Sequence, residues 1–158
     1  MTNDASFMDG APLALSLGVQ DADDLRVVSA LVQDAILPVS EIAWDARARQ
    51  LALLLNRFRW EDADAAAREE RPFERVRSVL LVRDAMRVQT DGITREGDMI
   101  LELLAITWQP GADGTGRLLL EFAGDGTLAV ECECLNAELR DVTRPYAAPS
   151  GLRPTHPD

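Results

Sequence analysis

The segment best suited to binding chemistry is Asn56-Arg57-Phe58-Arg59-Trp60, because it places two guanidinium groups next to aromatic rings. In an extended strand, successive side chains point to opposite faces. Alternation therefore predicts Arg57 and Arg59 on one face of the strand. It predicts Asn56, Phe58 and Trp60 on the other.

Two further arginines, Arg47 and Arg49, lie in the turn of the same predicted hairpin. Four guanidinium groups close together would bind a carboxylate, a phosphate or an acidic partner, because each can donate paired hydrogen bonds to such groups. The simpler alternative is that these arginines pair with local acids such as Asp45, Glu61 and Asp62. The predicted binding residues are Arg47, Arg49, Asn56, Arg57, Arg59 and Trp60.

The cysteine and histidine content argues against the common metal and nucleophile sites. Cys132 and Cys134 supply two thiols on one predicted strand, His156 is the single histidine, and the chain has no lysine. A closed zinc site needs four ligands, and a serine or cysteine nucleophile needs a base. We therefore predict no catalytic residue, no metal and no cofactor, and interpret both cysteines as facing the core.

Two weaker patterns have ordinary structural explanations. Glu131 and Glu133 would lie about 7 Å apart on one strand face, which resembles the carboxylate spacing of a hydrolase. Exposed strands commonly carry such solvated pairs. The glycines Gly111, Gly114 and Gly116 lack the lysine and the following helix of a phosphate-binding loop, so they predict a hairpin loop.

Hydrophobic periodicity supplies the elements that must position these residues. Asp21 is a suitable N-cap, and helical spacing of apolar residues predicts a helix over 22–33. Pro38 indicates an edge or a bulge in an extended segment over 36–44. Residues 61–72 are interpreted as a short surface helix or a loop. Period-two patterns predict strands over 13–17, 50–60, 76–88, 99–108, 118–122 and 128–139.

These elements predict an α+β fold dominated by β-structure. About seven mostly antiparallel strands would form a sandwich or a partly closed barrel, with one N-terminal helix covering an open end or face. A pleckstrin-homology-like barrel is one candidate. We expect a disordered N-terminus over 1–12, a single β-rich domain over 13–142, and a Pro-rich tail over 143–158 that Tyr146 can anchor.

Composition limits the partners and the compartment. The formal net charge of −11 opposes binding to nucleic acid and to anionic membranes. No export signal is visible, and no apolar run approaches the roughly 20 residues that span a bilayer. We expect a cytoplasmic protein whose partner is another protein, a small molecule or a second copy of the chain.

Several blocks of the sequence resemble a bacterial family known only as domain of unknown function 2948. They include 29–35, 54–60, 103–106, 130–135 and 139–142, and the similarity extends from Leu13 to about Pro149. The resemblance implies a one-domain bacterial protein. It implies no activity, cofactor or functional residue.

Three functions follow from these observations. The first is a non-enzymatic binding or adaptor module that uses the Arg-rich hairpin. The second is a small-ligand-binding domain with an apolar pocket inside the β-structure. The third is an enzyme based on two carboxylates in a cleft.

Overall fold

The computed structural model describes residues 14–94 and 99–155, and over these residues the fold is a β-dominant α+β fold. Two helices and eleven strands are present in the described residues, and every strand pairing is antiparallel. The predicted class and strand orientation are confirmed, whereas the strand number exceeds the predicted seven. The eleven strands form one sheet that does not close into a barrel. The pleckstrin-homology-like barrel stays a prediction.

The helices are α2 (Ala22–Leu31) and α3 (Trp60–Arg68), and two short 3-10 turns cover Val39–Glu41 and Ala112–Gly114. The strands are β1 (Ser16–Val19), β2 (Ala35–Pro38), β3 (Ile42–Asp45), β4 (Gln50–Phe58), β5 (Glu74–Val82), β6 (Ala85–Asp91), β7 (Ile100–Pro110), β8 (Gly116–Phe122), β9 (Thr127–Cys132), β10 (Ala137–Asp141) and β11 (Tyr146–Ala147).

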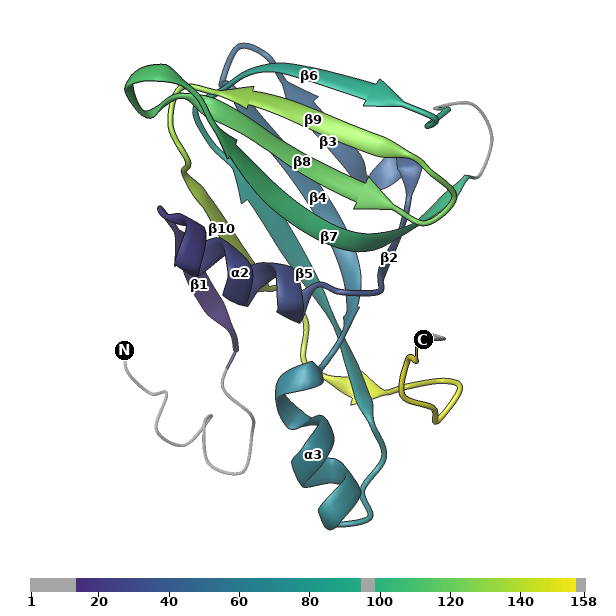
Figure 1. Cartoon of the computed structure of the whole chain (residues 1–158). Helices are drawn as coiled ribbons and strands as arrows, with labels where there is room; N and C mark the ends of the chain where they lie inside the picture. The colour runs from purple at the N-terminus through teal and green to yellow at the C-terminus, as the bar shows by residue number, and fades with distance from the viewer. Residues whose placement is uncertain (1–13, 95–98, 156–158) are drawn as a thin grey trace.

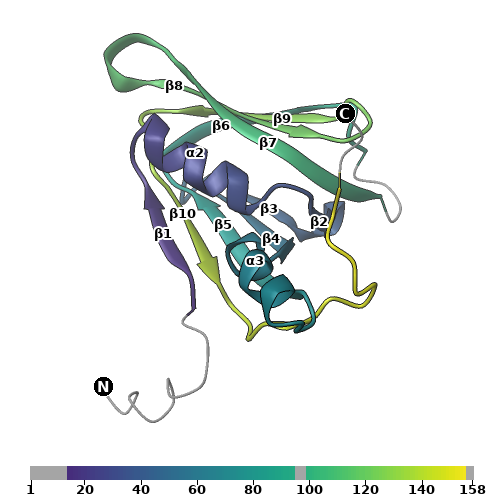
Figure 2. The same ribbon diagram turned by 60° about the horizontal axis from the view of Figure 1, so that its bottom comes forward.

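The sheet folds back on itself to make two layers around one core. Its hydrogen-bonded order is β1-β10-β5-β4-β2-β7-β8-β9-β6, with β3 added to β4 and β11 added to β5. One layer contains β7, β8, β9 and β6, and the other contains β3, β4, β5, β10 and β1 (Figure 1). Helix α2 lies along the open side between β1 and β7 (Figure 2). The sheet therefore needs no closing strand on this side.

Helix α2 begins and packs as its sequence predicts. The Asp21 carboxylate accepts a hydrogen bond from the Asp24 backbone N–H at 2.8 Å, which satisfies a free donor of the first turn. Leu25 and Val28 are buried against the sheet. The predicted helix over 22–33 is thus confirmed, with its end at Leu31.

Two predicted long strands, 76–88 and 128–139, are each broken into two strands in the structure. Asp84 adopts a left-handed φ of 55° between β5 and β6, and residues 133–136 separate β9 from β10. The two breaks are tied together, because Glu133 N–H donates to the Asp84 carbonyl at 3.0 Å. At this corner both chain segments pass from one layer to the other. The apolar alternation in the sequence continues through both breaks, so it did not predict them.

The hairpin strand predicted over 50–60 ends early, at Phe58, and Trp60 begins helix α3. The segment over 61–72 is therefore largely helical. Helix α3 lies below the two layers (Figure 1) and buries Ala63 and Ala66. Its first turn carries two acids, which suit the positive end of a helix dipole.

The C-terminal segment lies against β5 and α3. Strand β11 pairs with the first residues of β5, and Ala148 N–H donates to the Phe73 carbonyl at 2.8 Å. Arg153 lies 5.9 Å from the Trp60 ring centroid and forms an ion pair with Asp64 at 3.3 Å. The expected disorder over 1–12 and His156 fall outside the described residues. No helix in the described part of the chain is long and apolar enough to cross a membrane.

Candidate functional site

Arg57, the centre of the predicted binding surface, is buried in the interior with 0% of its side chain exposed. Its parity on β4 is that of Leu51, Leu53 and Leu55, which are all buried in the core. Because the strand keeps this alternation to its end, the Arg57 guanidinium enters the lower end of the core. It does not lie on the surface of the hairpin.

Three side chains from three elements surround this guanidinium. Arg57 donates to both carboxylate oxygens of Glu61 in α3, at 2.9 and 2.8 Å. It also donates to Asp141 of β10 at 3.0 Å and to the Ser78 hydroxyl of β5 at 3.0 Å. The Ser78 hydroxyl in turn donates to Asp141 at 2.6 Å, and Leu15 N–H donates to the other Asp141 oxygen at 3.1 Å.

The electrostatics of this cluster favour the charged forms of Arg57 and Glu61. Burial disfavours the Arg57 cation, but the adjacent Glu61 and Asp141 carboxylates outweigh burial and raise its pKa. Burial likewise opposes the Glu61 anion, and the hydrogen bonds from Arg57 outweigh it and lower the pKa of Glu61. All guanidinium nitrogens are engaged within the chain, so the cluster joins β4, β5, β10 and α3 and offers no free donor to a ligand.

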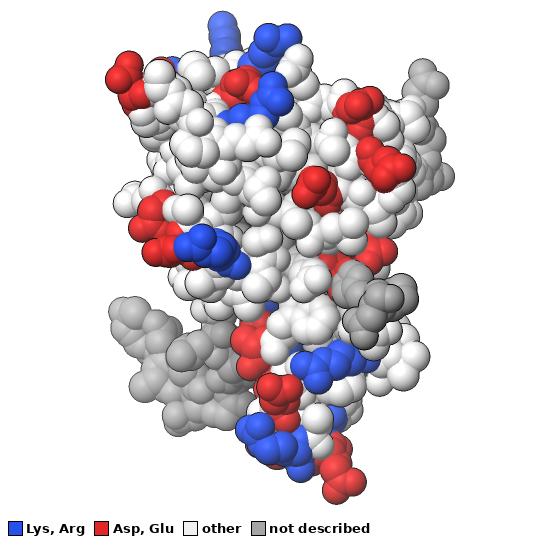
Figure 3. All heavy atoms as spheres, in the orientation of Figure 1, with Lys and Arg blue, Asp and Glu red and all other residues white. Residues whose placement is uncertain are grey.

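The remaining predicted residues near α3 are also held by local contacts. Arg59 pairs with Glu74 and lies 3.7 Å from Asp62, and only 12% of its side chain is exposed. The Trp60 indole N–H donates to the Gln33 carbonyl at 2.9 Å. Acidic and basic side chains lie next to one another over α3 at the bottom of the molecule (Figure 3). This is the local pairing that the alternative interpretation of the sequence described.

The two turn arginines lie far along β4 from Arg57, at the opposite end of that strand. Arg49 forms an ion pair with Glu133 at 2.8 Å, which raises the pKa of Arg49. Arg47 is exposed and makes no ion pair with a described residue. The four arginines are therefore not brought together into one surface.

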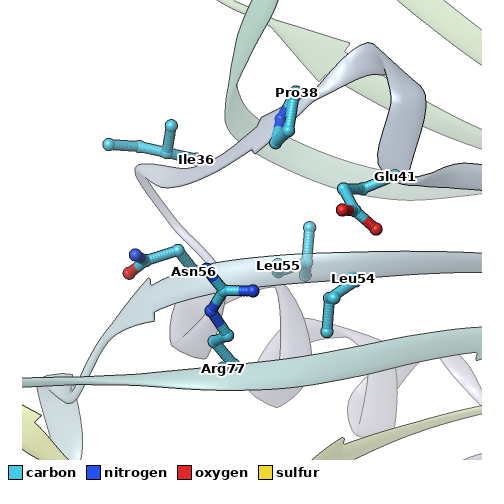
Figure 4. A pocket seen from close by; sticks show the side chains of 7 residues that line it. All are labelled: Ile36, Pro38, Glu41, Leu54, Leu55, Asn56 and Arg77. Atoms are coloured by element: carbon cyan, nitrogen blue, oxygen red, sulfur yellow. The ribbon is translucent and has the colours of Figure 1, made fainter.

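A groove does lie on the outer face of β4, and one predicted residue, Asn56, lines it. Its lining residues are Ile36, Pro38, Glu41, Leu54, Leu55, Asn56 and Arg77, around a cavity of about 150 Å³ (Figure 4). The groove forms because β2 and β3 both pair with β4 but leave a gap. Ile36 pairs with Asn56 and Ile42 pairs with Leu53, while between them β2 continues beside β7, with Pro38 paired to Ile100.

Opposite charges face this groove. The Arg77 guanidinium reaches over β4 near Asn56, and the Glu41 carboxylate points toward Leu54 (Figure 4). Both side chains are exposed, and neither makes an ion pair with a described residue. Ile36, 41% exposed, forms part of the apolar wall between them.

Asn56 is oriented by a neighbour outside the groove. Arg75 donates to the Asn56 side-chain oxygen at 2.6 Å and to its backbone carbonyl at 2.9 Å. Partial burial lowers the pKa of Arg75. These contacts fix the Asn56 side chain, whose amide points away from the Arg77 guanidinium (Figure 4).

The comparisons with known proteins give one result. The family model described as "Protein of unknown function (DUF2948)" matches residues 15–156. The chain belongs to the DUF2948 family. No curated protein and no solved structure matches this member of the family.

The cysteines of this DUF2948 chain do not share the predicted environment. Cys132 is buried, and burial raises its pKa to about 11. Cys134 was predicted to face the core and is exposed, because β9 ends at Cys132. The described residues contain no group of three or more His, Cys, Asp or Glu side chains that could hold a metal ion.

The two carboxylates considered in the sequence, Glu131 and Glu133, each pair with a different arginine. Glu131 pairs with Arg117 at 2.7 Å, and Glu133 pairs with Arg49 at 2.8 Å. Each carboxylate is thus neutralised by its own arginine. The arrangement holds neighbouring strands together and places no free acid beside a free base.

Sequence reasoning missed Arg77, the main charged group of the groove. A signal was present, since Arg77 alternates with the core residues Val76 and Ser78 and must point outward. Its approach to Asn56 depends on the pairing of β4 with β5, which places the two residues directly opposite each other. Local patterns alone do not predict that register.

Proposed function

We propose that the protein is a non-enzymatic binding module and that the groove of Figure 4 recognises a carboxylate attached to a small apolar group. The observation that carries this proposal is the Arg77 guanidinium, which is exposed at the groove and without an ion-pair partner among the described residues. Every other arginine of the predicted hairpin except Arg47 is engaged by an acid of its own chain.

The donor set supports a carboxylate in particular. A guanidinium presents two parallel N–H groups that match the two oxygens of a carboxylate. The Arg77 guanidinium reaches over β4 into the groove, where it is exposed and makes no ion pair with a described residue.

The size and lining of the groove limit what is attached to the carboxylate. A cavity of about 150 Å³ is smaller than the roughly 300–1,000 Å³ of sites for drug-sized ligands and cofactors. Ile36, Pro38 and Leu54 supply an apolar wall and floor. A branched aliphatic carboxylate, or the side chain or chain end of a partner protein with the same chemistry, fits both limits.

An NMR titration with isovalerate tests this proposal, with uncharged isovaleramide as the matched probe. Both are added to the wild-type protein and to Glu41→Gln, which removes the acid that lines the groove. We expect isovalerate, and not isovaleramide, to shift the resonances of the Asn56 side chain and of Arg77.

Two variants make the result specific. Arg77→Ala should abolish the isovalerate shifts, whereas Arg47→Ala, which removes an exposed arginine away from the groove, should leave them unchanged. Equal shifts with the amide, or shifts that survive in Arg77→Ala, would exclude carboxylate recognition at this groove.

A further inference from the structure

We infer that the partner seated on this groove is a second copy of the chain, whose Glu41 supplies the carboxylate bound by Arg77. This inference rests on the proposed function, because it uses the same donors. It identifies the carboxylate as that of Glu41, which lines the same groove in the second copy.

The groove contains both halves of a self-complementary contact. In a two-fold symmetric interface, a residue that contacts a second residue across the axis is matched by the reciprocal contact. Glu41 and Arg77 both line one groove, both are exposed, and neither is paired with a described residue of its own chain. A two-fold axis through the middle of the groove brings each Arg77 to the Glu41 of the other copy. Two ion pairs then form.

The outer face of β4 and β5 is also more apolar than a solvated sheet face. Antiparallel sheets usually carry polar residues on the wet side. Here Leu54 lies directly opposite Val79, and Ala52 lies directly opposite Leu81, all on the outward parity. Together with exposed Ile36, these half-buried residues give the groove an apolar surround.

The net charge of −11 on each copy opposes association at long range. At physiological salt, charges separated by more than about 8 Å are largely screened. The charges at the contact itself, the Glu41 carboxylate and the Arg77 guanidinium, therefore determine whether two copies associate, and these are opposite in sign. Because the groove is small, we expect a dimer that dissociates on dilution.

Charge reversal tests the inference. Sedimentation velocity of the full chain, over concentrations from micromolar to millimolar, should show a monomer–dimer equilibrium for the wild type. Arg77→Glu alone and Glu41→Arg alone should each weaken dimerisation by about tenfold or more, because each places like charges at both contacts. Arg47→Glu, the same charge change in the β3–β4 turn, should leave the equilibrium unchanged.

Mixing the two reversed variants provides the decisive measurement. A chain with Arg77→Glu and a chain with Glu41→Arg would pair opposite charges at both contacts, so the mixture should form a heterodimer although each variant alone remains monomeric. Misfolded variants would not recover in this way.

Two results would overturn the inference. They are a wild-type monomer at millimolar concentration, and a mixture of the reversed variants that stays monomeric. Isovalerate binding to Glu41→Gln is measured separately. A monomer that binds isovalerate would refute the second copy alone, and a protein that binds no carboxylate would refute the proposed function as well.

Discussion

Replacing Arg57 by methionine should destabilise the protein severely, although the sequence suggests that this residue is on the surface. Methionine fills the space of the arginine stem but removes every donor of the guanidinium. Asp141, whose side chain is 5% exposed, then remains buried without a cation. Removing one partner of a buried ion pair costs about 3–5 kcal/mol of unfolding free energy.

The surroundings of Asp141 place this loss near the lower end of that range. Asp141 keeps hydrogen bonds from the Ser78 hydroxyl at 2.6 Å and from the Leu15 N–H at 3.1 Å, so we expect a loss of about 3 kcal/mol for Arg57→Met. Urea unfolding followed by circular dichroism measures it. Arg47→Met is the matched control, because an exposed side chain should change the stability by no more than about 0.5 kcal/mol.

A second variant separates loss of the ion pair from loss of packing. Arg57→Met combined with Asp141→Leu removes both members of the pair, so no buried charge is left without its partner. Replacement of buried ion pairs by apolar groups is often neutral. The double variant should therefore be more stable than the sum of the two single changes predicts. The account of the cluster is refuted if Arg57→Met costs less than about 1 kcal/mol with an unchanged denaturant dependence.

Three further predictions concern Glu61 of the Arg57 cluster, the two cysteines and Gly116. Because the folded pKa of Glu61 is lowered, its contribution to stability is complete above about pH 4.3 and is lost as the pH falls; urea unfolding between about pH 6 and pH 3 should show a shallower loss for Glu61→Gln than for the wild type. Thiol titration of the native protein should modify exposed Cys134 much faster than buried Cys132, and equal rates would contradict the burial difference. A methyl group at Gly116 would approach the neighbouring indole ring within 2.4 Å, so Gly116→Ala should cost about 1–3 kcal/mol in urea unfolding. The same change at the glycine of β1, which has open space, should cost much less.

The case of Arg57 shows what the sequence could predict and why it stopped short. Alternation along β4 was recognised, and it placed Arg57 and Arg59 on one face. The same alternation carries the parity of Leu51, Leu53 and Leu55 forward to Arg57, which predicts burial. The charge of Arg57 suggested instead that its side chain is exposed to solvent. Its main buried partner, Asp141, lies 84 residues later in the chain, so no local pattern signalled the pairing.

The corner between β5 and β6 could not be predicted from the sequence for a related reason. Burial alternates along β5 but not along β6, and the chain changes direction at the two residues between them, with Asp84 in a left-handed conformation. Aspartate tolerates that conformation better than most residues, but one aspartate in an apolar run is a weak signal. Helix α2 was easier to predict, because its N-cap and its apolar face are both local.

The groove arises from long-range pairing around a local irregularity. Pro38 indicated an edge or a bulge, whereas β2 lies between β4 and β7 in the sheet and ends at Pro38, where a 3-10 turn follows. The sequence did not show that β2 leaves β4 for β7, or that Arg77 reaches the gap from the other side. Those features depend on strand register, which local patterns do not fix.

A crystal structure of Glu41→Gln grown with isovalerate tests the central claim most directly, namely that the binding surface is the groove and not the Arg-rich hairpin. We predict the carboxylate on the Arg77 guanidinium, with the methyl groups against Ile36 and Pro38. An isovalerate bound at Arg47 or Arg49, with the groove empty, would contradict the account.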